Sequence, residues 1–474
     1  MKVLFVSSEV APFARTGGLG EFCGALPFYL AQKGIKVDVV LPLYRCVKEG
    51  QYTLEEVIEG LRQALGWRWL NFSVYRTDYK GIKIFFIERD EFFDRSFLYA
   101  TKKEAYFDNA ERFIFFVKAV LCFAEHYTEN WDIIHCHDWQ TALIPVYLKQ
   151  EFYPLLKVKT LLTIHNLGYQ GVFPSQSFSL TNLPSGLFSL DGLEFFGQLN
   201  FLKGGIIFSD FLTTVSPTYA KEIQTPNYGF GLDGLLRTSA HKLKGILNGV
   251  DYTVWNPEVD PYIVSKYSTL NLEGKEKCKE DLLRICNLPY SKKPILAMVS
   301  RLAKQKGIDL LLEILPRLMQ REVYFIILGQ GEKHYEDVLK SIALAYPRKM
   351  CVKIVFDPIL SHKIMAGADM LLMPSRYEPC GLAQLYAMRY GTLPIVHNTG
   401  GLADTVIDIK NKNGTGFKFY TYSTEAFWQA IERALSCFEQ KQLWQDCMRQ
   451  AMECNFSWGK TAHEYLSLYQ ALLS

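Results

Sequence analysis

PILAMVSRLAKQKG (residues 294–307) and DMLLMPSRYEPCGL (residues 369–382) decide the fold of this chain. Each stretch starts with an apolar run typical of a buried strand and continues into a polar loop. In open α/β sheets ligands bind beside the C-terminal ends of the strands, so a ligand is expected at these two loops. Arg301 and Lys306 bring two cations to the first loop, and Glu378 brings a carboxylate to the second. Cations beside a carboxylate suit a ligand that carries both a diphosphate and a polyol, which indicates a nucleotide sugar.

The rest of the chain repeats the alternation of apolar runs with amphipathic, helix-like stretches. Strands that alternate with helices predict parallel sheets with right-handed crossovers, so we expect an α/β protein with doubly wound domains. IKIFFIE (residues 82–88) could instead belong to an antiparallel excursion. The other predicted strands are KVLFVSS, VDVVLPLY, DIIHCHD, KTLLTIHN, VYFIILG, VKIVF and LPIVHN.

The domain organisation follows from length and from one connection. A chain of 474 residues is too long for a single core. The Gly-, Asn- and Pro-containing stretch at residues 244–260 suits a connection and a hinge. We therefore predict Rossmann-like domains at residues 1–245 and 246–455; the family resemblance described below implies that the first lies on the acceptor side and the second on the donor side. Residues 456–474 are predicted to form a terminal helix that crosses back to the first domain.

Composition narrows the class of protein. A net charge of +3 argues against a nucleic-acid-binding protein. The 11 cysteines form no CxxC pair, which is typical of reduced thiols in a cytoplasmic protein. MKVLFV at the N-terminus resembles a signal peptide, but Glu9 interrupts it, and a first strand is the better interpretation. No segment reaches the roughly 20 apolar residues that span a bilayer. We expect a soluble, cytoplasmic protein, and the oligomeric state is left open.

The tetrapeptide TGGL occurs twice, at residues 16–19 and 399–402, each time between a predicted strand and a predicted helix. Glycine pairs permit close backbone approach and supply N–H groups for phosphate oxygens. Gly17 and Gly18 are therefore candidate ligand-binding residues, although a tight turn alone also explains a Gly-Gly pair.

The order of the longer motifs resembles that of bacterial glycogen synthases and plant starch synthases, nearly from end to end. The resemblance implies a GT-B fold, with two doubly wound Rossmann-like domains facing a central cleft. It also implies ADP-glucose as donor, α-1,4-glucan (glycogen) as acceptor, retention at the anomeric carbon, and neither a cofactor nor a metal. The motifs include RTGGLGEFCGALP, IIHCHDWQTALIP, TIHNLGYQG, ILNGVDYTVWNP, SRLAKQKGIDLL and PSRYEPCGLAQLYAMRYGTLPIV.

The resemblance implies a role for each residue that matches a family motif. Arg301 and Lys306 are expected to bind the diphosphate of the donor. Preorganised cations there would stabilise the charge that develops on departing ADP. Glu378 is expected to contact sugar hydroxyls near the reacting carbon, and His165 to touch the glucosyl group. These four residues are the predicted catalytic set. The backbone N–H groups expected to complete the cradle belong to Cys380, Gly381 and Leu382.

Three further residues are expected near the donor or acceptor. The resemblance places Asn248 near the donor, Asp138 near the sugar, and Phe356 beside the adenine. For Phe356, packing in the core explains an apolar side chain nearly as well as stacking does.

Two other interpretations of these motifs are weaker. His135 and His137 with Asp138 suggest a metal site because alternate residues of a strand point the same way. The resemblance argues against a metal, since the fold holds its diphosphate with side-chain cations and amides. A nucleophilic Cys380 lacks a base nearby in the sequence.

Two positions depart from the family pattern, because Arg15 stands where lysine is usual and Glu21 where aspartate is usual. Arginine keeps the charge but replaces a point charge with a planar fork. Both residues are predicted to bind the donor, and the two substitutions are expected to alter its fine positioning.

The sequence therefore predicts a retaining glucosyltransferase that adds glucose from ADP-glucose to the non-reducing end of an α-1,4-glucan and releases ADP. A UDP-sugar transferase or epimerase of the same fold is the second hypothesis. A glucan-binding protein with little catalysis is the third, motivated by Arg15 and Glu21.

Overall fold

The computed structural model describes residues 1–101, 104–150, 153 and 157–474. The chain forms two compact units, and it passes from the first into the second between Gly249 and Val250, inside the connection at residues 244–260. The first unit comprises Met1–Val215, Ala220–Gly249 and Trp458–Ser474, and the second comprises Ser216–Tyr219 and Val250–Ser457.

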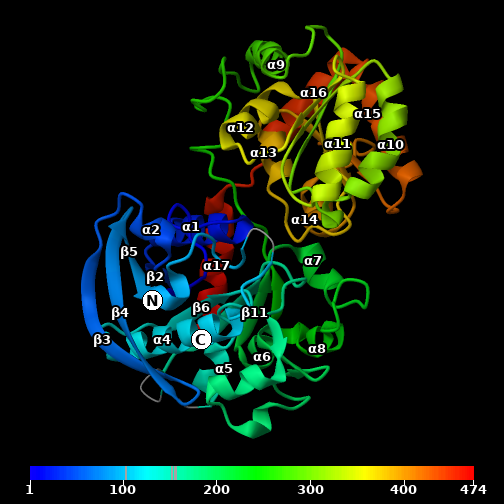
Figure 1. The fold of residues 1–474 in the computed structure, drawn as a ribbon. Helices are drawn as coiled ribbons and strands as arrows, with labels where there is room; N and C mark the ends of the chain where they lie inside the picture. Colours follow the sequence, from blue (N-terminus) through cyan, green and yellow to red (C-terminus); the bar gives the residue numbers. More distant parts are fainter. Residues whose placement is uncertain (102–103, 151–152, 154–156) are drawn as a thin grey trace. The chain divides into compact units, whose positions relative to one another are not determined.

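The first unit is built on a nine-stranded sheet (Figure 1), in the order β12-β11-β7-β6-β1-β2-β5-β4-β3. All neighbours from β12 to β5 are parallel. The strands are β1 (Lys2–Val6), β2 (Lys36–Pro42), β3 (Glu55–Leu65), β4 (Arg68–Tyr79), β5 (Ile82–Glu88), β6 (Ile133–His137), β7 (Lys159–Ile164), β11 (Phe211–Thr214) and β12 (Leu243–Gly245).

The antiparallel part of this sheet is the hairpin β3–β4, which continues into β5. IKIFFIE forms β5 itself, which pairs parallel with β2 on one side and antiparallel with β4 on the other. The expected antiparallel segment thus exists, but it consists mainly of β3 and β4, the two polar strands that precede β5. β3, at the edge of the sheet, is exposed or half-buried at every residue except Leu65, and the first half of β4 alternates more exposed with buried residues, as suits strands with one solvated face.

Helices cover the sheet of the first unit, and the chain between β7 and β11 adds a small antiparallel sheet, β8-β10-β9. The final helix of the chain packs against α1, so the C-terminal segment belongs to the first unit. The elements are α1 (Gly18–Ala31), α2 (Arg45–Lys48), α3 (Asp90–Phe93), α4 (Asn109–His126), α5 (Ile144–Lys149), β8 (Val172–Pro174), η1 (Ser175–Thr181), η2 (Ser185–Leu187), β9 (Glu194–Phe195), β10 (Gln198–Asn200), α6 (Phe201–Phe208), α7 (Pro217–Glu222, which begins in the second unit), α8 (Asp233–Thr238), η3 (Ala240–Lys242) and α17 (Trp458–Leu473).

The second unit has a six-stranded sheet, parallel throughout, in the order β15-β14-β13-β16-β17-β18. Its strands are β13 (Ile295–Val299), β14 (Tyr324–Leu328), β15 (Met350–Lys353), β16 (Met370–Met373), β17 (Leu393–His397) and β18 (Phe417–Phe419). Its helical elements are α9 (Glu273–Ile285), η4 (Lys304–Lys306), α10 (Ile308–Gln320), α11 (Lys333–Ala345), α12 (Pro358–Gly367), α13 (Ala383–Arg389), α14 (Gly400–Thr405), α15 (Thr424–Phe438) and α16 (Lys441–Glu453).

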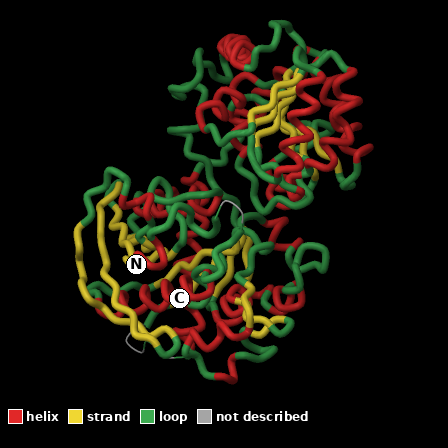
Figure 2. The backbone as a smooth tube through the Cα atoms, viewed as in Figure 1, coloured by secondary structure: helices red, strands yellow, loops and turns green. Residues whose placement is uncertain are grey.

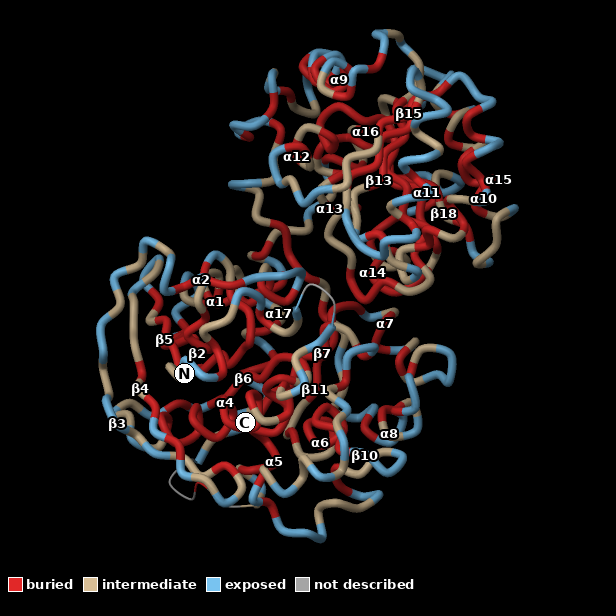
Figure 3. Tube along the Cα trace, viewed as in Figure 1, coloured by how far each residue is buried: buried red, intermediate tan, exposed pale blue. Residues whose placement is uncertain are grey.

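The core of each unit lies along its parallel strands (Figures 2 and 3). Parallel strands that are covered on both faces need apolar residues at successive positions, which is why the predicted strands are continuous apolar runs. Every residue of β14 and β16 is buried, and so is every residue of β6. In β6 this includes His135 and His137, so this polar pair lies in the interior of the first unit.

Strand order places a topological switch point in each unit. In the second unit, the chain runs outward from β13 in one direction and resumes at β16 in the other. In the first unit the equivalent neighbours are β1 and β6. Ligands of doubly wound sheets bind beside the carboxyl ends of such strands, because the loops diverge there and leave room.

Two chain-wide features concern the expected class of protein. The cysteines of the chain are free thiols, and most are buried. Among the described residues, no helix combines the length and the apolar character needed to cross a bilayer.

Candidate active site

The second-unit site consists of the loops after β13 and β16, at the switch point of that sheet. Lys306, at the end of η4, donates from Nζ to both carboxylate oxygens of Glu378, at 2.8 and 2.6 Å. Glu378 is only 5% exposed. The two predicted catalytic residues, 72 positions apart in the sequence, thus form a largely buried ion pair.

Neighbouring groups fix the Glu378 carboxylate and backbone in place. The Ser375 hydroxyl donates to Glu378 Oε2 at 2.9 Å, and the Ser375 carbonyl accepts from His397 Nδ1 at 2.8 Å. The Gly401 N–H donates to the Glu378 carbonyl at 3.0 Å. Sequence reasoning missed Ser375 and His397, although each lies at the end of an apolar strand that it identified.

Two glycines let the loops of this site approach one another. Gly307 has φ +75°, and a Cβ there would lie 1.9 Å from the Pro374 carbonyl oxygen. A Cβ on Gly401 would lie 2.0 Å from the Cys380 carbonyl oxygen. The second TGGL motif is therefore explained by close packing against the loop that carries Glu378.

The other predicted residues of the second unit lie on the same loops or near them. Arg301 is an exposed residue of the loop after β13, while Cys380 is buried and directly precedes Gly381 and Leu382 before α13. Phe356 is 72% exposed beyond the end of β15, so packing in the core is the wrong explanation for it. An exposed aromatic face leaves the stacking prediction in place.

In the first unit, the loop after β1 carries the first TGGL motif. A Cβ added at Gly17 or Gly18 would meet no atom of the described residues within 4 Å, so this turn is open, unlike the second TGGL turn. Arg15 and Glu21 form an ion pair with each other across the turn. The two residues that depart from the family pattern therefore contact each other, on side chains that are 44% and 41% exposed.

Asp138 follows β6 and holds the loop after β7. Its φ of +54° is in the left-handed region, which aspartate tolerates better than most residues. The carboxylate accepts the backbone N–H of His165 at 2.7 Å. Burial raises the pKa of Asp138 to about 7, against hydrogen bonds from the backbone of His165 and Asn166 that lower it. Burial also lowers the pKa of His165 to about 3, so its imidazole is neutral.

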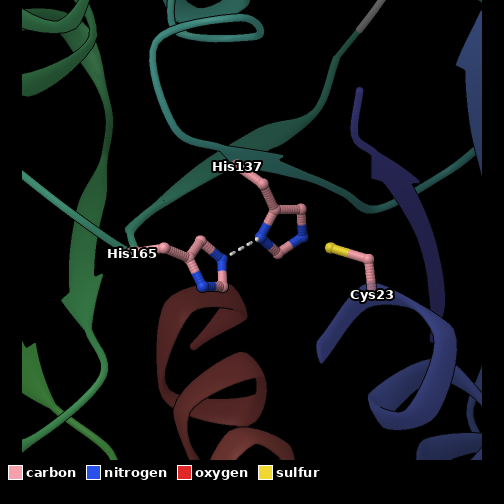
Figure 4. Close-up of side chains that lie close together, drawn as sticks. All are labelled: Cys23, His137 and His165. Carbon is pink, nitrogen blue, oxygen red and sulfur yellow. Dashed lines mark hydrogen bonds between the residues drawn. The ribbon is translucent and has the colours of Figure 1, made fainter. Parts of the chain in front are cut away.

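The histidines of β6 do not form the metal pair that their spacing suggests. Both ring nitrogens of His135 are hydrogen-bonded, Nδ1 to the Tyr469 hydroxyl at 2.8 Å and Nε2 to the Thr163 hydroxyl at 2.6 Å. His137 instead meets His165, with 3.2 Å between His137 Nδ1 and His165 Nε2 (Figure 4). Burial lowers the pKa of both His135 and His137 well below the usual range.

Two more buried polar groups belong to the first-unit site. Glu9, which follows β1, accepts hydrogen bonds from the hydroxyls of Thr16 (2.7 Å) and Tyr99 (2.9 Å) and so anchors the first TGGL turn. Sequence reasoning noted Glu9 only as an interruption of the apolar N-terminus. Asn248 is buried, and its Oδ1 has no hydrogen-bond partner among the described residues. An unsatisfied buried oxygen is what a ligand hydroxyl would pair with, in keeping with the prediction for Asn248.

Comparisons with known proteins show the family of this chain. Residues 2–238 match the family model described as starch synthase catalytic domain, and residues 281–450 match glycosyl transferases group 1. The glycogen synthase of Thermodesulfovibrio yellowstonii is 46% identical over 100% of this chain and 98% of its own length. The chain belongs to the glycogen and starch synthase family. The glycogen synthase of Koribacter versatilis is 44% identical over 99% of this chain and 98% of its own.

Solved structures of this family and beyond share the fold. The catalytic domain of starch synthase IV from Arabidopsis thaliana, bound to ADP and acarbose, matches with a TM-score of 0.92 and 32% identity over 99% of both chains. Sucrose-phosphate synthase from Thermosynechococcus elongatus matches with a TM-score of 0.63 at 18% identity, over 99% of this chain and 98% of that one. The family member described here is a glycosyltransferase with a GT-B fold.

Proposed function

We propose that this glycosyltransferase transfers glucose from ADP-glucose to the non-reducing end of an α-1,4-glucan such as glycogen, with retention at the anomeric carbon and release of ADP. The observation that carries the proposal is the buried ion pair between Lys306 and Glu378 at the switch point of the second unit. The proposal places the reaction in the cytoplasm, where free thiols persist.

The second-unit site supplies charge where the reaction needs it. Cleavage of the bond between glucose and phosphate develops negative charge on the leaving ADP. Arg301 and Lys306 are the cations for that charge, and Lys306 acts without reorganising because Glu378 already orients it. Glu378 keeps acceptor capacity for sugar hydroxyls, since a carboxylate accepts about four hydrogen bonds. Phe356 presents an exposed ring suited to stacking on adenine.

The first-unit site supplies neutral hydrogen-bonding groups for the glucosyl unit. Neutral His165 can donate or accept a hydrogen bond. Because its imidazole carries no charge, it does not repel a sugar that becomes positively charged in the transition state. Asp138 fixes the backbone of His165 through the 2.7 Å hydrogen bond. Asn248 offers its Oδ1, which has no partner among the described residues, and the open turn at Gly17 and Gly18 offers backbone N–H groups.

We further propose that the leaving phosphate takes the proton of the acceptor hydroxyl, on the same face of the sugar. A double displacement would need a carboxylate positioned as a nucleophile. Glu378 is committed to Lys306 and Ser375, and Asp138 is committed to backbone amides. In this proposal, transfer needs no metal ion or cofactor.

The test is an incubation of the purified protein with glycogen and labelled ADP-glucose or UDP-glucose, in EDTA, followed by counting of label in polymer. The proposal expects strong transfer from ADP-glucose alone. Stronger transfer from UDP-glucose would favour the second hypothesis, a UDP-sugar transferase. Retention on glycogen with no transfer from either donor would favour a glucan-binding protein. Dependence on an added divalent metal would overturn the metal-free mechanism.

A further inference from the structure

Two imidazoles of the first-unit site contact each other. Nδ1 of His137, the last residue of β6, lies 3.2 Å from Nε2 of His165, which follows β7. His137 is fully buried, and His165 is 8% exposed. Figure 4 shows the contact on one side of the His137 ring and the sulfur of Cys23 on the other. Two ring nitrogens this close share a hydrogen bond, so one of them carries the proton and the other accepts it.

Each ring is neutral, so the protons can be placed in only two ways. Burial lowers the pKa of His137 well below the usual range and that of His165 to about 3. A neutral imidazole has one N–H and one nitrogen that accepts. Either His137 donates from Nδ1 and its Nε2 is a bare acceptor, or His165 donates from Nε2 and the proton of His137 is on its own Nε2. The two arrangements give His165 opposite tautomers.

The surroundings of His137 Nε2 favour the first arrangement. This atom is buried and has no hydrogen-bond partner among the described residues. In the second arrangement it would carry a proton and become a buried N–H without an acceptor, and native proteins rarely contain such a group.

The thiol of Cys23 suits the same arrangement. Its sulfur lies on the Nε2 side of the ring in Figure 4, within 4.8 Å of a ring nitrogen of His137. Burial raises the pKa of this thiol well above the usual range, so the thiol keeps its proton. An S–H group is a weak donor, and pointing it at a bare nitrogen offsets part of the cost of burying that lone pair. The first arrangement therefore leaves no N–H of the His137 ring without an acceptor.

This arrangement fixes the tautomer of His165. Because Nε2 of His165 accepts from His137, its own proton is on Nδ1, and Nδ1 is the nitrogen that remains for a ligand. Asp138 holds the backbone of the same residue by accepting its N–H at 2.7 Å. His137 is itself held by Thr141, whose hydroxyl accepts the His137 N–H at 2.6 Å and donates to the His137 carbonyl at 2.9 Å. His165 is thus fixed at both its backbone and its ring.

We propose that His137 is a positioning residue for glucosyl transfer. Its Nδ1–H donates to Nε2 of His165 and holds that ring as the tautomer that donates from Nδ1 to an oxygen of the glucosyl unit. The catalytic part of this role rests on the proposed function, in which His165 contacts the glucosyl unit. A nitrogen that carries a proton cannot act as a base towards the acceptor hydroxyl, in keeping with the proposed transfer of that proton to the leaving phosphate.

The tautomer is tested by NMR spectroscopy on the full wild-type chain, independently of activity. The histidine rings are labelled with ¹⁵N, and long-range ¹H–¹⁵N correlations show which nitrogen of each ring carries the proton. We expect His137 and His165 each to be protonated at Nδ1 and unprotonated at Nε2. The spectra of His137→Asn and His165→Gln identify the two sets of signals. A proton on Nε2 of either ring would overturn the proposal.

Two variants at position 137 separate the hydrogen bond from packing. In His137→Asn the amide nitrogen takes the place of Nδ1 and keeps the donor to His165, so transfer should stay within about 3-fold of the wild type. His137→Phe fills the site with an apolar ring that cannot donate, so kcat should fall at least about 10-fold. The KM for ADP-glucose should change by less than about 3-fold, because the proposed diphosphate cations lie in the second unit. His126→Phe, which removes an exposed histidine at the end of α4, should leave both constants unchanged.

The kinetic outcomes decide the role of the hydrogen bond. Equal kcat values for His137→Phe and the wild type, with native circular dichroism, would overturn the positioning role. So would a His137→Asn protein as slow as His137→Phe, because the first keeps the donor and the second does not. If His137→Phe does not fold, the wild-type tautomers and the rate of His137→Asn decide instead. A wild-type chain that shows the expected tautomers but transfers no glucose would leave the pairing of the two rings standing and overturn the proposed function, and with it the role of His137 in transfer.

Discussion

The two candidate sites occupy equivalent places in their sheets but differ in how they treat charge. The second-unit site holds a lysine against a carboxylate, in bidentate contact. The first-unit site buries imidazoles in the neutral form and raises the pKa of its carboxyl, Asp138, to about 7. The same topology thus serves two electrostatic purposes. Fixed charge suits a departing diphosphate, and neutral hydrogen-bonding groups suit a sugar that becomes cationic in the transition state.

The largest expected effect comes from breaking the charged site. Lys306→Met should lower glucosyl transfer about 10³-fold, because it removes a preorganised cation from the leaving group. It should also lower the free energy of unfolding by about 3 kcal/mol, since Glu378 is left as a buried, unpaired carboxylate. Initial rates of label transfer and urea titrations measure the two effects.

The double variant Lys306→Met/Glu378→Gln separates these contributions. It should recover part of the unfolding free energy, because no unpaired charge remains, while transfer stays as low as in Lys306→Met. Recovery of transfer in the double variant would show that Lys306 acts only on stability.

The next prediction compares the Lys306–Glu378 ion pair with a lysine of the first unit that is buried against a neutral amide. Lys118 donates to Asn182 Oδ1 at 2.6 Å, and burial lowers its pKa to about 8. The unfolded chain therefore binds more protons than the folded chain between pH 8 and the ordinary lysine pKa of 10.5. Over that interval the wild-type protein should gain about 3 kcal/mol of unfolding free energy relative to Lys118→Met. Urea titrations of both proteins at several pH values give this difference, and a constant difference would contradict the charged, buried lysine.

A smaller effect is expected from the carboxyl of the neutral site. Asp138→Asn keeps an oxygen that accepts the N–H of His165 but removes the carboxylate form, which is about half populated at pH 7, so transfer should fall about 10-fold. Asp38→Asn is a matched control, because Asp38 is also buried and accepts from Trp131 at 2.9 Å outside both sites. Equal rates for both variants would remove Asp138 from the site.

The smallest effect concerns the exposed ion pair beside the first TGGL turn. Arg15→Lys/Glu21→Asp restores the usual family residues and keeps opposite charges together. Because exposed ion pairs contribute less than about 1 kcal/mol, transfer should change by less than about 5-fold. A large gain in transfer would instead show that these departures reduce turnover.

The sequence predicted the strand ends and the loops that carry Arg301, Lys306 and Glu378, because parallel strands are continuous apolar runs and their loops are polar. It could not predict that Lys306 and Glu378 form an ion pair, since their contact depends on β13 and β16 being neighbours in the sheet. The spacing of His135 and His137 was misleading for a similar reason. His135 is paired with Tyr469, which lies 334 residues away. The hairpin β3–β4 was missed because polar residues interrupt both strands and neither contains a strong apolar run.

The membership of α17 in the first unit has a consequence for synthesis on the ribosome. Residues 458–474 emerge after the whole second unit, yet Trp458 and Tyr465 pack against Phe22, and Tyr469 completes the hydrogen bonding of buried His135. A nascent chain therefore exposes this apolar face of α1 throughout translation of the second unit. The first unit to leave the ribosome is the last to finish folding.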